Sequence, residues 1–344
     1  MNELEKIRAI IDKIDKEITS KLLERIKLVQ SLHKKKNKAN DIIVDIHREN
    51  NILDNITSEI TDTKIKLLIK NIYVKILQEI KLFSYQQDKT IIDSFKSLIS
   101  QKKLLIAGPC SVETEEQINI IAKFLSQNNI KFIRGGIFKA RTNPNSFQGL
   151  GEAGLEIFYN AAKNNSLYTV SEFLDIEQAK SYFEYFDIIL VGSRNMTNFE
   201  FLRKLGKLTA INQKPIILKR GYASTIDEFL YAAKYITDEG NPNVILCLRG
   251  IRTFEQSTPY FRFTPDLHSL LEIRDKSNLP VIFDPSHSAG NRKIVEPLAK
   301  MAIDLKFDGL IIETHHKPNE AWSDAQQAID LDVLIKIAKY MKIC

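Results

Sequence analysis

Residues 104–111 read LLIAGPCS, and this stretch decides the fold of most of the chain. The apolar run at 104–107 is typical of a buried strand, and Gly108-Pro109 ends it. Cys110 therefore comes just beyond the carboxyl end of a strand. A cysteine is more often a small buried apolar residue than a functional one. Cys110 therefore becomes a candidate functional residue only when the residues that follow the later strands are considered with it.

Strand-like and helix-like segments alternate from this stretch to the end of the chain. The apolar runs lie at 104–107, 131–134, 168–172, 187–192, 215–219, 244–249, 281–284 and 309–313. Amphipathic segments lie near 114–127, 151–164, 176–184, 198–206, 225–237, 265–276, 291–304 and 323–342. Eight such pairs predict an α/β fold of the (β/α)8 TIM barrel type. A doubly wound open sheet is the alternative, but it usually needs fewer strands, and the phosphate-binding pattern GxxxxGK[ST] is absent from the sequence.

The first third of the chain has a different character. Residues 1–107 contain neither glycine nor proline, and apolar residues recur in steps of three and four, which predicts helices over 1–37, 45–55 and 63–87. We therefore expect an all-α three-helix domain over 1–88, a linker over 89–100 and the barrel over 101–344. A helix of more than about 30 residues spans about 50 Å and cannot bury its apolar stripe against two shorter helices. This predicts an intertwined helical dimer.

Composition narrows the function classes. The 344 residues are 44% hydrophobic and 27% charged, as in globular domains with a substantial core. The sequence has no apolar run of about 18 residues and no signal peptide, and its three cysteines form no disulfide pattern, so we expect a cytoplasmic protein. The net charge of +6 is spread over Lys-rich helices. We expect no nucleic-acid or membrane partner, and anionic small molecules suit the charge.

Polar side chains follow the predicted strands, and in a (β/α)8 barrel these strand ends meet at one mouth. Four of them offer a thiol, an imidazole and two carboxylates: Cys110, His287, Glu313 and Asp324. This mixture of donors suits a divalent transition metal and leaves room for a substrate oxygen or water. We expect Mn²⁺ there, with Fe²⁺, Co²⁺ and Zn²⁺ as alternatives.

A second set at the strand ends is cationic: Arg134, Lys139, Arg141, Arg194, Lys219 and Arg249. A barrel mouth with this many cations would repel itself without anionic ligands. Arginine presents a planar fork to carboxylates and phosphates, and lysine acts as a point charge. The residues thus predict metal-assisted chemistry on substrates with at least two anionic groups, such as phosphorylated sugars or acids.

Seven strings carry a resemblance to a known family: AGPCSVE, RGGIFKARTNPNSFQGLG, VGSRNMTN, ILKRGYAST, LRGIRTFEQST, DPSHSAG and IETHHKPNEAWSDAQQ. They resemble the 3-deoxy-D-arabino-heptulosonate 7-phosphate (DAHP) synthases of type Iβ, over about residues 100–344. The resemblance implies a metal-dependent (β/α)8 barrel that condenses phosphoenolpyruvate with erythrose 4-phosphate and releases phosphate.

The same resemblance implies residue roles. It implies that the metal is bound by Cys110, His287, Glu313 and Asp324. It also implies that phosphoenolpyruvate is bound by Arg134, Lys139, Arg194, Lys219 and Arg249. Lys139, Arg141 and Thr142 match the loop that receives erythrose 4-phosphate. Lys139 is placed either to donate a proton or to stabilise developing charge, and Asp284 is placed to hold His287 or a substrate hydroxyl.

One departure concerns the substrate loop, where Ala140 replaces the proline usual in the family. The lost restriction on φ should loosen the loop by about 0.4–1 kcal/mol and remove no functional group. Sister enzymes that use arabinose 5-phosphate or N-acetylmannosamine share the barrel, so a metal-dependent aldolase or sister synthase is the rival interpretation. The pair Arg141-Thr142 favours erythrose 4-phosphate.

The helical domain resembles the all-helical chorismate mutases through the spacing of its polar residues: Arg8, Arg25, Lys36, Asp45, Arg48, Glu49 and Ser84. The resemblance implies that Arg8 of a partner subunit, with Arg25 and Lys36, binds the carboxylates and ether oxygen of chorismate. Asp45, Arg48 and Glu49 would line the hydroxyl side, and Ser84 would close the pocket. The family's late glutamine falls on Asp88 by spacing, with Gln87 one place short.

We therefore predict a homodimer or homotetramer with two activities, DAHP synthase and chorismate mutase. One alternative makes the helical domain a weak or non-catalytic mutase that senses chorismate or prephenate and inhibits the barrel. Another makes it only an oligomerisation coiled coil.

Overall fold

A computed structural model describes residues 2–39, 46–84, 89–141, 143–254 and 262–344. The chain divides into two compact units, Met1–Gln86 and Gln87–Cys344, which are described separately below. Within the described residues, no helix is both long enough and apolar enough to cross a membrane.

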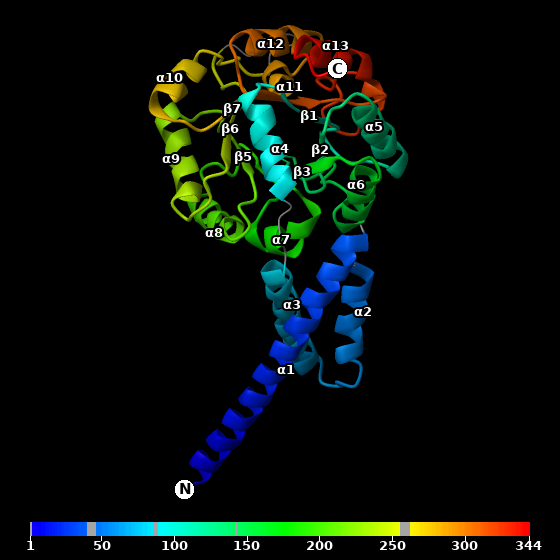
Figure 1. Cartoon of the computed structure of the whole chain (residues 1–344), viewed down its shortest axis with the longest axis vertical. Helices are drawn as coiled ribbons and strands as arrows, with labels where there is room; N and C mark the ends of the chain where they lie inside the picture. Colours follow the sequence, from blue (N-terminus) through cyan, green and yellow to red (C-terminus); the bar gives the residue numbers. More distant parts are fainter. Residues whose placement is uncertain (1, 40–45, 85–88, 142, 255–261) are drawn as a thin grey trace. The chain divides into compact units, whose positions relative to one another are not determined.

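The first unit consists of three helices, as predicted: α1 (Glu3–Ala39), α2 (Ile46–Ile56) and α3 (Thr63–Ser84) (Figure 1). Helix α3 packs against α1 and α2. The apolar stripe of α1 is nonetheless left open to solvent, because Ile7, Ile11, Ile14 and Ile18 remain 50%, 50%, 49% and 52% exposed. One chain therefore does not bury the stripe that its own sequence provides.

The second unit is a closed barrel of eight parallel strands in sequence order, which confirms the predicted fold. The strands are β1 (Leu104–Gly108), β2 (Phe132–Arg134), β3 (Tyr168–Glu172), β4 (Ile188–Val191), β5 (Ile216–Lys219), β6 (Val244–Leu248), β7 (Val281–Phe283) and β8 (Gly309–Glu313). Strand β1 pairs with β8 along its whole length, from Leu104 beside Gly309 to Gly108 beside Glu313, and this pairing closes the ring.

Helices surround the barrel: α5 (Glu115–Gln127), α6 (Glu152–Asn164), α7 (Ile176–Ser181), α8 (Phe199–Ala210), α9 (Ile226–Thr237), α10 (Ser269–Lys276), α12 (Arg292–Asp304) and α13 (Leu331–Tyr340). Short side chains cap several of them; Thr225 and Glu228 form a reciprocal capping box at the start of α9. The segment expected at 176–184 is split into α7 and a 3₁₀ turn, η1 (Phe183–Tyr185).

The structure differs from the expectation in the last helix. We expected a helix over 323–342, but α13 begins at Leu331, where Asp330 caps its first turn. The preceding residues form a 3₁₀ turn, η2 (Pro318–Glu320), and a loop. In that loop Asp324 adopts a left-handed backbone conformation, with φ 49°, that a helix cannot contain. A further short helix, α11 (Pro285–Ala289), follows β7 and was not expected.

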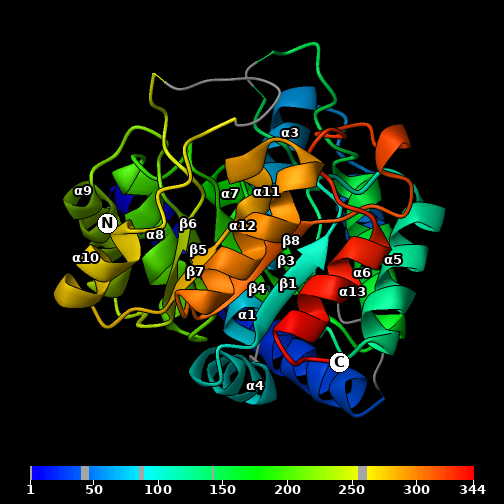
Figure 2. The same ribbon diagram turned by 90° about the horizontal axis from the view of Figure 1, so that it is seen from above.

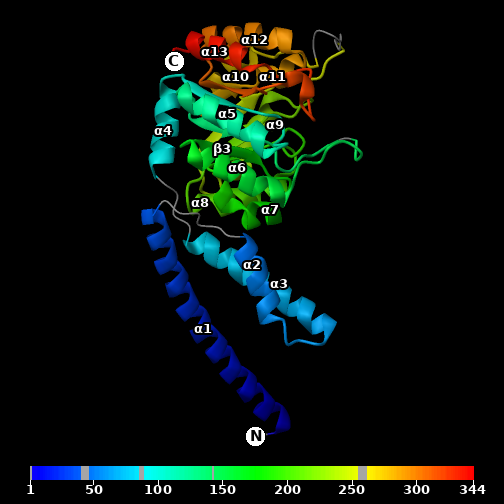
Figure 3. The same ribbon diagram turned by 90° about the vertical axis from the view of Figure 1, so that its right-hand side faces the viewer.

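The segment expected to be a linker, 89–100, is instead largely the helix α4 (Lys89–Ser100). Phe95 on α4 is buried in a cluster with residues at the amino ends of the strands, including Leu104 and Phe132, and its ring lies 5.6 Å from that of Phe132. Figures 2 and 3 show α4 at one end of the barrel and the long loop after β2 at the other. Helix α4 thus closes the amino end, and the carboxyl end is left for a site.

Candidate active site

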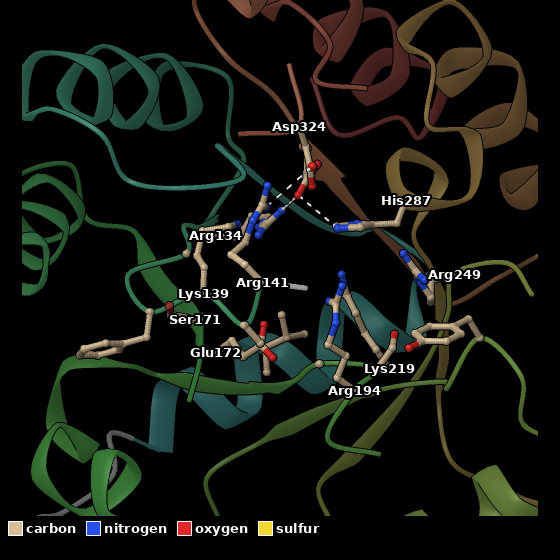
Figure 4. Close-up of a pocket in the computed structure, with 18 of the residues that line it drawn as sticks. Arg134, Lys139, Arg141, Ser171, Glu172, Arg194, Lys219, Arg249, His287 and Asp324 are labelled. Atoms are coloured by element: carbon tan, nitrogen blue, oxygen red, sulfur yellow. Dashed lines mark hydrogen bonds and ion pairs between the residues drawn. The ribbon is translucent and has the colours of Figure 1, made fainter. Parts of the chain in front are cut away.

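A cavity of about 690 Å³ lies at the carboxyl ends of the strands (Figure 4). Its lining, among the described residues, includes eight cationic side chains: Arg134, Lys139, Arg141, Arg194, Lys219, Arg249, Arg252 and Arg262. Three carboxylates share the lining: Glu172, Glu313 and Asp324. The cavity is therefore a strongly electropositive space, which suits anionic ligands.

The four residues predicted as metal ligands come together at this cavity. Donor atoms of Cys110, Glu313 and Asp324 all lie within 4.8 Å of one another. The Cys110 thiol donates to Asp324 Oδ2 at 3.3 Å, and His287 Nε2 lies 3.5 Å from Glu313 Oε1. A thiol just after β1, an imidazole on α11, a carboxylate at the end of β8 and another in the loop after β8 form one donor set. Their chemistry fits a divalent transition metal.

Two of these donors have strongly shifted pKa values. Burial, together with the Glu313 carboxylate, raises the pKa of the Cys110 thiol to about 12. Burial alone would also raise the pKa of Glu313, but His287 and Arg134 prevail and lower it. Arg134 Nη1 lies 2.5 Å from Glu313 Oε1. Glu313 is therefore ionised at neutral pH, whereas the thiol needs a nearby cation to lose its proton.

Asp284 connects the imidazole to the cationic set. Its Oδ2 accepts from Lys219 Nζ at 2.5 Å and lies 2.7 Å from His287 Nδ1, while Oδ1 caps α11 by accepting from the His287 backbone N–H. Burial opposes ionisation of Asp284, but His287 and Lys219 hold its pKa well below the usual value. With Nδ1–H directed at Asp284, His287 keeps the Nε2 lone pair for the donor set.

The cationic side chains carry buried donors that no described group satisfies. The Nε atoms of Arg134 and Arg249 are buried without a hydrogen-bond partner among the described residues. The Arg249 guanidinium lies over the ring of Phe263 at 4.1 Å, and burial lowers its pKa to about 10. Figure 4 shows Arg194, Lys219 and Arg249 directed into the space that faces His287 and Asp324. Buried unsatisfied donors of this kind indicate a ligand with acceptor oxygens.

The loop after β2 brings its own residues to the donor set. Lys139 Nζ donates to the Cys110 carbonyl at 2.8 Å and to Cys110 Sγ at 2.9 Å. Arg141 lies 3.9 Å from Asp324. Thr142, predicted to share this subsite, lies outside the described residues.

The residues of the cavity that sequence reasoning missed include Glu172, Arg252, Arg262 and Tyr222. Glu172 is the last residue of β3, so it sits at the same strand-end position that identified the other candidates. Burial raises its pKa, and the cations Lys219 and Lys139 partly oppose that rise. A Cβ on Gly192 would lie 2.0 Å from Glu172 Oε1, so glycine at 192 makes the space that this carboxyl group occupies.

The mutase candidates are described only in part. Arg8 is exposed and Arg25 half-buried on α1, and Arg48 and Glu49 lie on α2. Lys36 and Ser84 lie in α1 and α3, but their side chains are outside what the structure describes, and Asp45, Gln87 and Asp88 lie outside the described residues altogether. Arg8 and Arg25 are seventeen residues apart on one helix, which is about 25 Å. One copy of α1 therefore does not bring both to the same small molecule.

Comparisons with known proteins agree with this division of the chain. Residues 94–343 match the DAHP synthetase I family, and residues 7–85 match chorismate mutase type II. The chain is 43% identical over 272 residues to the phospho-2-dehydro-3-deoxyheptonate aldolase of Thermotoga maritima, covering 78% of each protein. It is 30% identical over 271 residues to a 2-dehydro-3-deoxyphosphooctonate aldolase of Legionella pneumophila, covering 72% of this chain and 93% of that protein.

Solved structures are similar as well. The crystal structure of the Thermotoga maritima DAHP synthase superposes with a TM-score of 0.65 at 45% identity, covering 69% of this chain and 68% of that one. A truncated form of the Thermotoga maritima 3-deoxy-D-arabino-heptulosonate 7-phosphate synthase gives a TM-score of 0.62 at 42% identity, covering 69% of this chain and 84% of that one.

Proposed function

The chain belongs to the DAHP synthetase I family and carries a chorismate mutase type II domain ahead of the barrel, and from this premise we propose an assignment of substrates and metal to its residues. The barrel condenses phosphoenolpyruvate with erythrose 4-phosphate to DAHP and phosphate, and the helical domain rearranges chorismate to prephenate. The observation that carries the barrel assignment is one cavity that combines a mixed metal-donor set with eight cations.

Cys110, His287, Glu313 and Asp324 would hold the metal, with Mn²⁺ as the first choice and Fe²⁺, Co²⁺ or Zn²⁺ as alternatives. A bound divalent ion supplies a Lewis acid that polarises a carbonyl oxygen, or a water of lowered pKa. All three cysteines are free, and a reducing compartment such as the cytoplasm would keep the Cys110 thiol available for this role.

Arg134, Lys139, Arg194, Lys219 and Arg249 would bind the carboxylate and phosphate of phosphoenolpyruvate and orient its terminal carbon. Arg141 and Thr142 would receive the phosphate of erythrose 4-phosphate. A carbon–carbon bond then forms to the aldehyde carbon, water adds to the neighbouring carbon, and phosphate leaves. Lys139 serves this sequence either by donating a proton to the aldehyde oxygen or by stabilising its charge. The unsatisfied Nε atoms of Arg134 and Arg249 support the anion assignment.

Phosphate release tests the barrel assignment. We expect release from phosphoenolpyruvate with erythrose 4-phosphate to exceed release with arabinose 5-phosphate by at least 100-fold in kcat/KM, about 2.7 kcal/mol in transition-state binding. Because relatives at 30% identity act as 2-dehydro-3-deoxyphosphooctonate aldolases, this comparison is the discriminating one. Equal rates with the two sugars would contradict the choice of substrate.

The mutase reaction needs no acid, base or nucleophile. It requires a site that holds the compact conformer of chorismate and presents cations to the oxygen of the breaking C–O bond. We assign these cations to Arg25, Lys36 and the partner subunit's Arg8. Asp45, Arg48, Glu49, Ser84 and Gln87 would complete the pocket. The 25 Å separation along α1 supports the contribution of a second subunit.

Chorismate consumption by the full chain tests the mutase assignment. We expect Arg25→Ala to lower it by at least 100-fold and to leave phosphate release by the barrel unchanged. Binding of chorismate without turnover in the wild type would instead support the sensor alternative, which neither the structure nor the comparisons favour. Unchanged ligand binding in Arg25→Ala would support the coiled-coil alternative.

A further inference from the structure

A buried polar network, which we call the Glu113 network, lies beside the candidate metal site. It consists of Ser111, Glu113, His315, Trp322 and Ser323. All are buried except Trp322, whose backbone N–H nevertheless donates to Glu113 Oε1 at 2.8 Å. Ser111 Oγ lies 3.3 Å from the same oxygen, and His315 Nε2 lies 3.3 Å from Glu113 Oε2. One carboxylate thus joins the ends of β1 and β8 to the loop that follows β8.

The hydrogen-bond donors define the form of His315 in this network. The backbone N–H of Lys317 donates to His315 Nδ1 at 2.9 Å, so Nδ1 carries no proton. The proton is therefore on Nε2, which donates to Glu113. The buried Glu113 carboxylate accepts three hydrogen bonds, and the one from His315 fixes the orientation of the carboxylate.

The network includes the sequence neighbours of two candidate metal donors, Cys110 and Asp324. Ser111 directly follows Cys110, and Ser323 directly precedes Asp324. Their hydroxyl oxygens lie 2.6 Å apart, so the two chain segments that carry the thiol and the carboxylate are hydrogen-bonded to each other.

The network also reaches the substrate loop. The ring of Trp322 packs edge-on against Phe147 at 5.2 Å between centroids. Phe147 belongs to the loop after β2, which carries Lys139 and Arg141. The Glu113 carboxylate therefore accepts from the backbone of Trp322, and the ring of Trp322 contacts this loop at Phe147.

We propose that Glu113, oriented by His315, is a positioning residue that sets the Cys110–Asp324 donor pair and, through Trp322 and Phe147, the loop for the aldose phosphate. Glu113 touches neither substrate nor metal in this proposal. The proposal rests on the metal and substrate assignment made above. It predicts that loss of Glu113 disturbs metal binding and loop position together.

Zn²⁺ alone, titrated into the full-length protein by calorimetry, tests the first half. We expect Glu113→Gln to raise the Kd for Zn²⁺ by about 10- to 100-fold, as for other residues that orient metal ligands. Glu115→Gln, an exposed glutamate two residues away, is the matched control and should leave Kd unchanged. His315→Gln, whose amide can still donate to Glu113, should bind Zn²⁺ more tightly than His315→Leu.

Fluorescence tests the second half, because Trp322 is the single tryptophan of the chain. We expect Glu113→Gln and Phe147→Leu to shift its emission in the same direction, and the double variant to shift it no further than one of them. At saturating metal both variants should raise KM for erythrose 4-phosphate more than KM for phosphoenolpyruvate. Phe147 is on a surface loop, so the emission and KM of Phe147→Leu still test the contact between Trp322 and the loop if a Glu113 variant fails to fold.

The variant Cys110→Ala distinguishes failure of the proposed role of Glu113 from failure of the proposed metal site. Wild-type Zn²⁺ affinity in Cys110→Ala would refute the metal site itself. Loss of Zn²⁺ binding in Cys110→Ala, with wild-type Kd and emission in Glu113→Gln, would refute only the role of Glu113. Additive emission shifts in the double variant would likewise refute the link from Glu113 to the loop.

Discussion

At the scale of single residues, the Cys110 thiol has two polar neighbours beside the cavity. It lies 2.9 Å from Lys139 Nζ and 3.3 Å from Asp324 Oδ2. We expect Cys110→Ala to abolish metal-dependent phosphate release and to change the free energy of unfolding by about 1 kcal/mol or less, because the replaced atom is a single sulfur. Phosphate assays with added metal, together with urea unfolding, check both parts. Full wild-type activity in a chelator would contradict the metal role.

Lys214 shows that a shifted pKa can be structural. The side chain is fully buried, its Nζ donates to the carbonyls of Phe183 at 2.6 Å and of Phe186, and burial lowers its pKa to about 7. A neutral amine retains two N–H groups, which match these two carbonyl oxygens. Lys214 therefore anchors the η1 turn to the residues that precede β5, and it is not among the residues that line the cavity.

This lysine predicts a pH dependence of stability. Between pH 7 and the unfolded-state pKa of about 10.4, the unfolded chain binds a proton that the folded chain lacks. The free energy of unfolding should therefore rise with pH in this window, by up to about 1.4 kcal/mol per pH unit from this group. Urea unfolding across the window should show that slope in the wild type and in the exposed control Lys123→Met, and a smaller one in Lys214→Met. Parallel curves for all three proteins would contradict the prediction.

At the scale of elements, α4 contributes to the barrel although the sequence pattern suggested a linker. Phe95 is 3% exposed among apolar residues from the amino ends of the strands. We expect Phe95→Ala to lower the free energy of unfolding by about 3–5 kcal/mol, the usual cost of removing a buried ring. Lys96→Ala, at an exposed position on the same helix, should change it by less than about 0.5 kcal/mol. A loss below 1 kcal/mol at Phe95 would mean that α4 does not close the barrel.

The elements also show what the sequence can and cannot predict. The bounds of each strand agree to within one residue with those of a predicted apolar run. The agreement is close because strands that are buried on both faces have nearly continuous apolar sequences. Helix α4 was expected to be a linker although it carries apolar residues at helical spacing: Ile91, Ile92, Phe95, Leu98 and Ile99. The sequence does not show what this apolar face packs against, and in the structure Phe95 joins a cluster with Phe132 and its neighbours. The late start of α13 depends on the conformation of one loop, which short-range periodicity does not encode.

The candidate site divides in the same way. Cys110, His287 and Glu313 could be found because each lies at the carboxyl end of a strand or within four residues of it, and closure of the barrel brings such positions together. Glu172 occupies an equivalent position, yet a single carboxylate gives no pattern until its cationic neighbours are seen in space. The Glu113 network was beyond sequence reasoning, since its hydrogen bonds join residues more than 200 positions apart.

At the scale of the whole molecule, the exposed stripe of α1 predicts an obligate association for the mutase activity. Ile11 and Ile18 are 50% and 52% exposed in one chain. We expect Ile11→Asp with Ile18→Asp to shift the chain toward monomer in sedimentation equilibrium and to reduce chorismate consumption by at least tenfold, because charge on this stripe opposes its burial. Phosphate release per barrel should remain at the wild-type level. Lys13→Ala, on the same helix, is the control.

A double variant that is monomeric and retains full mutase activity would contradict the shared pocket. A wild-type chain that sediments as a monomer at micromolar concentration would contradict the dimer itself.

Among the described residues, eight cationic side chains and only three carboxylates line the cavity, and this excess of positive charge has a kinetic consequence. Such a mouth extends a positive potential into the surrounding solution and draws polyanions inward before contact, as in electrostatically steered encounters. Ionic strength should then depress capture of the substrates more than it depresses the turnover of molecules already bound. The same attraction should slow the release of the inorganic phosphate that forms in each cycle. Phosphate that accumulates should therefore inhibit the enzyme, so sustained flux requires that phosphate is removed quickly.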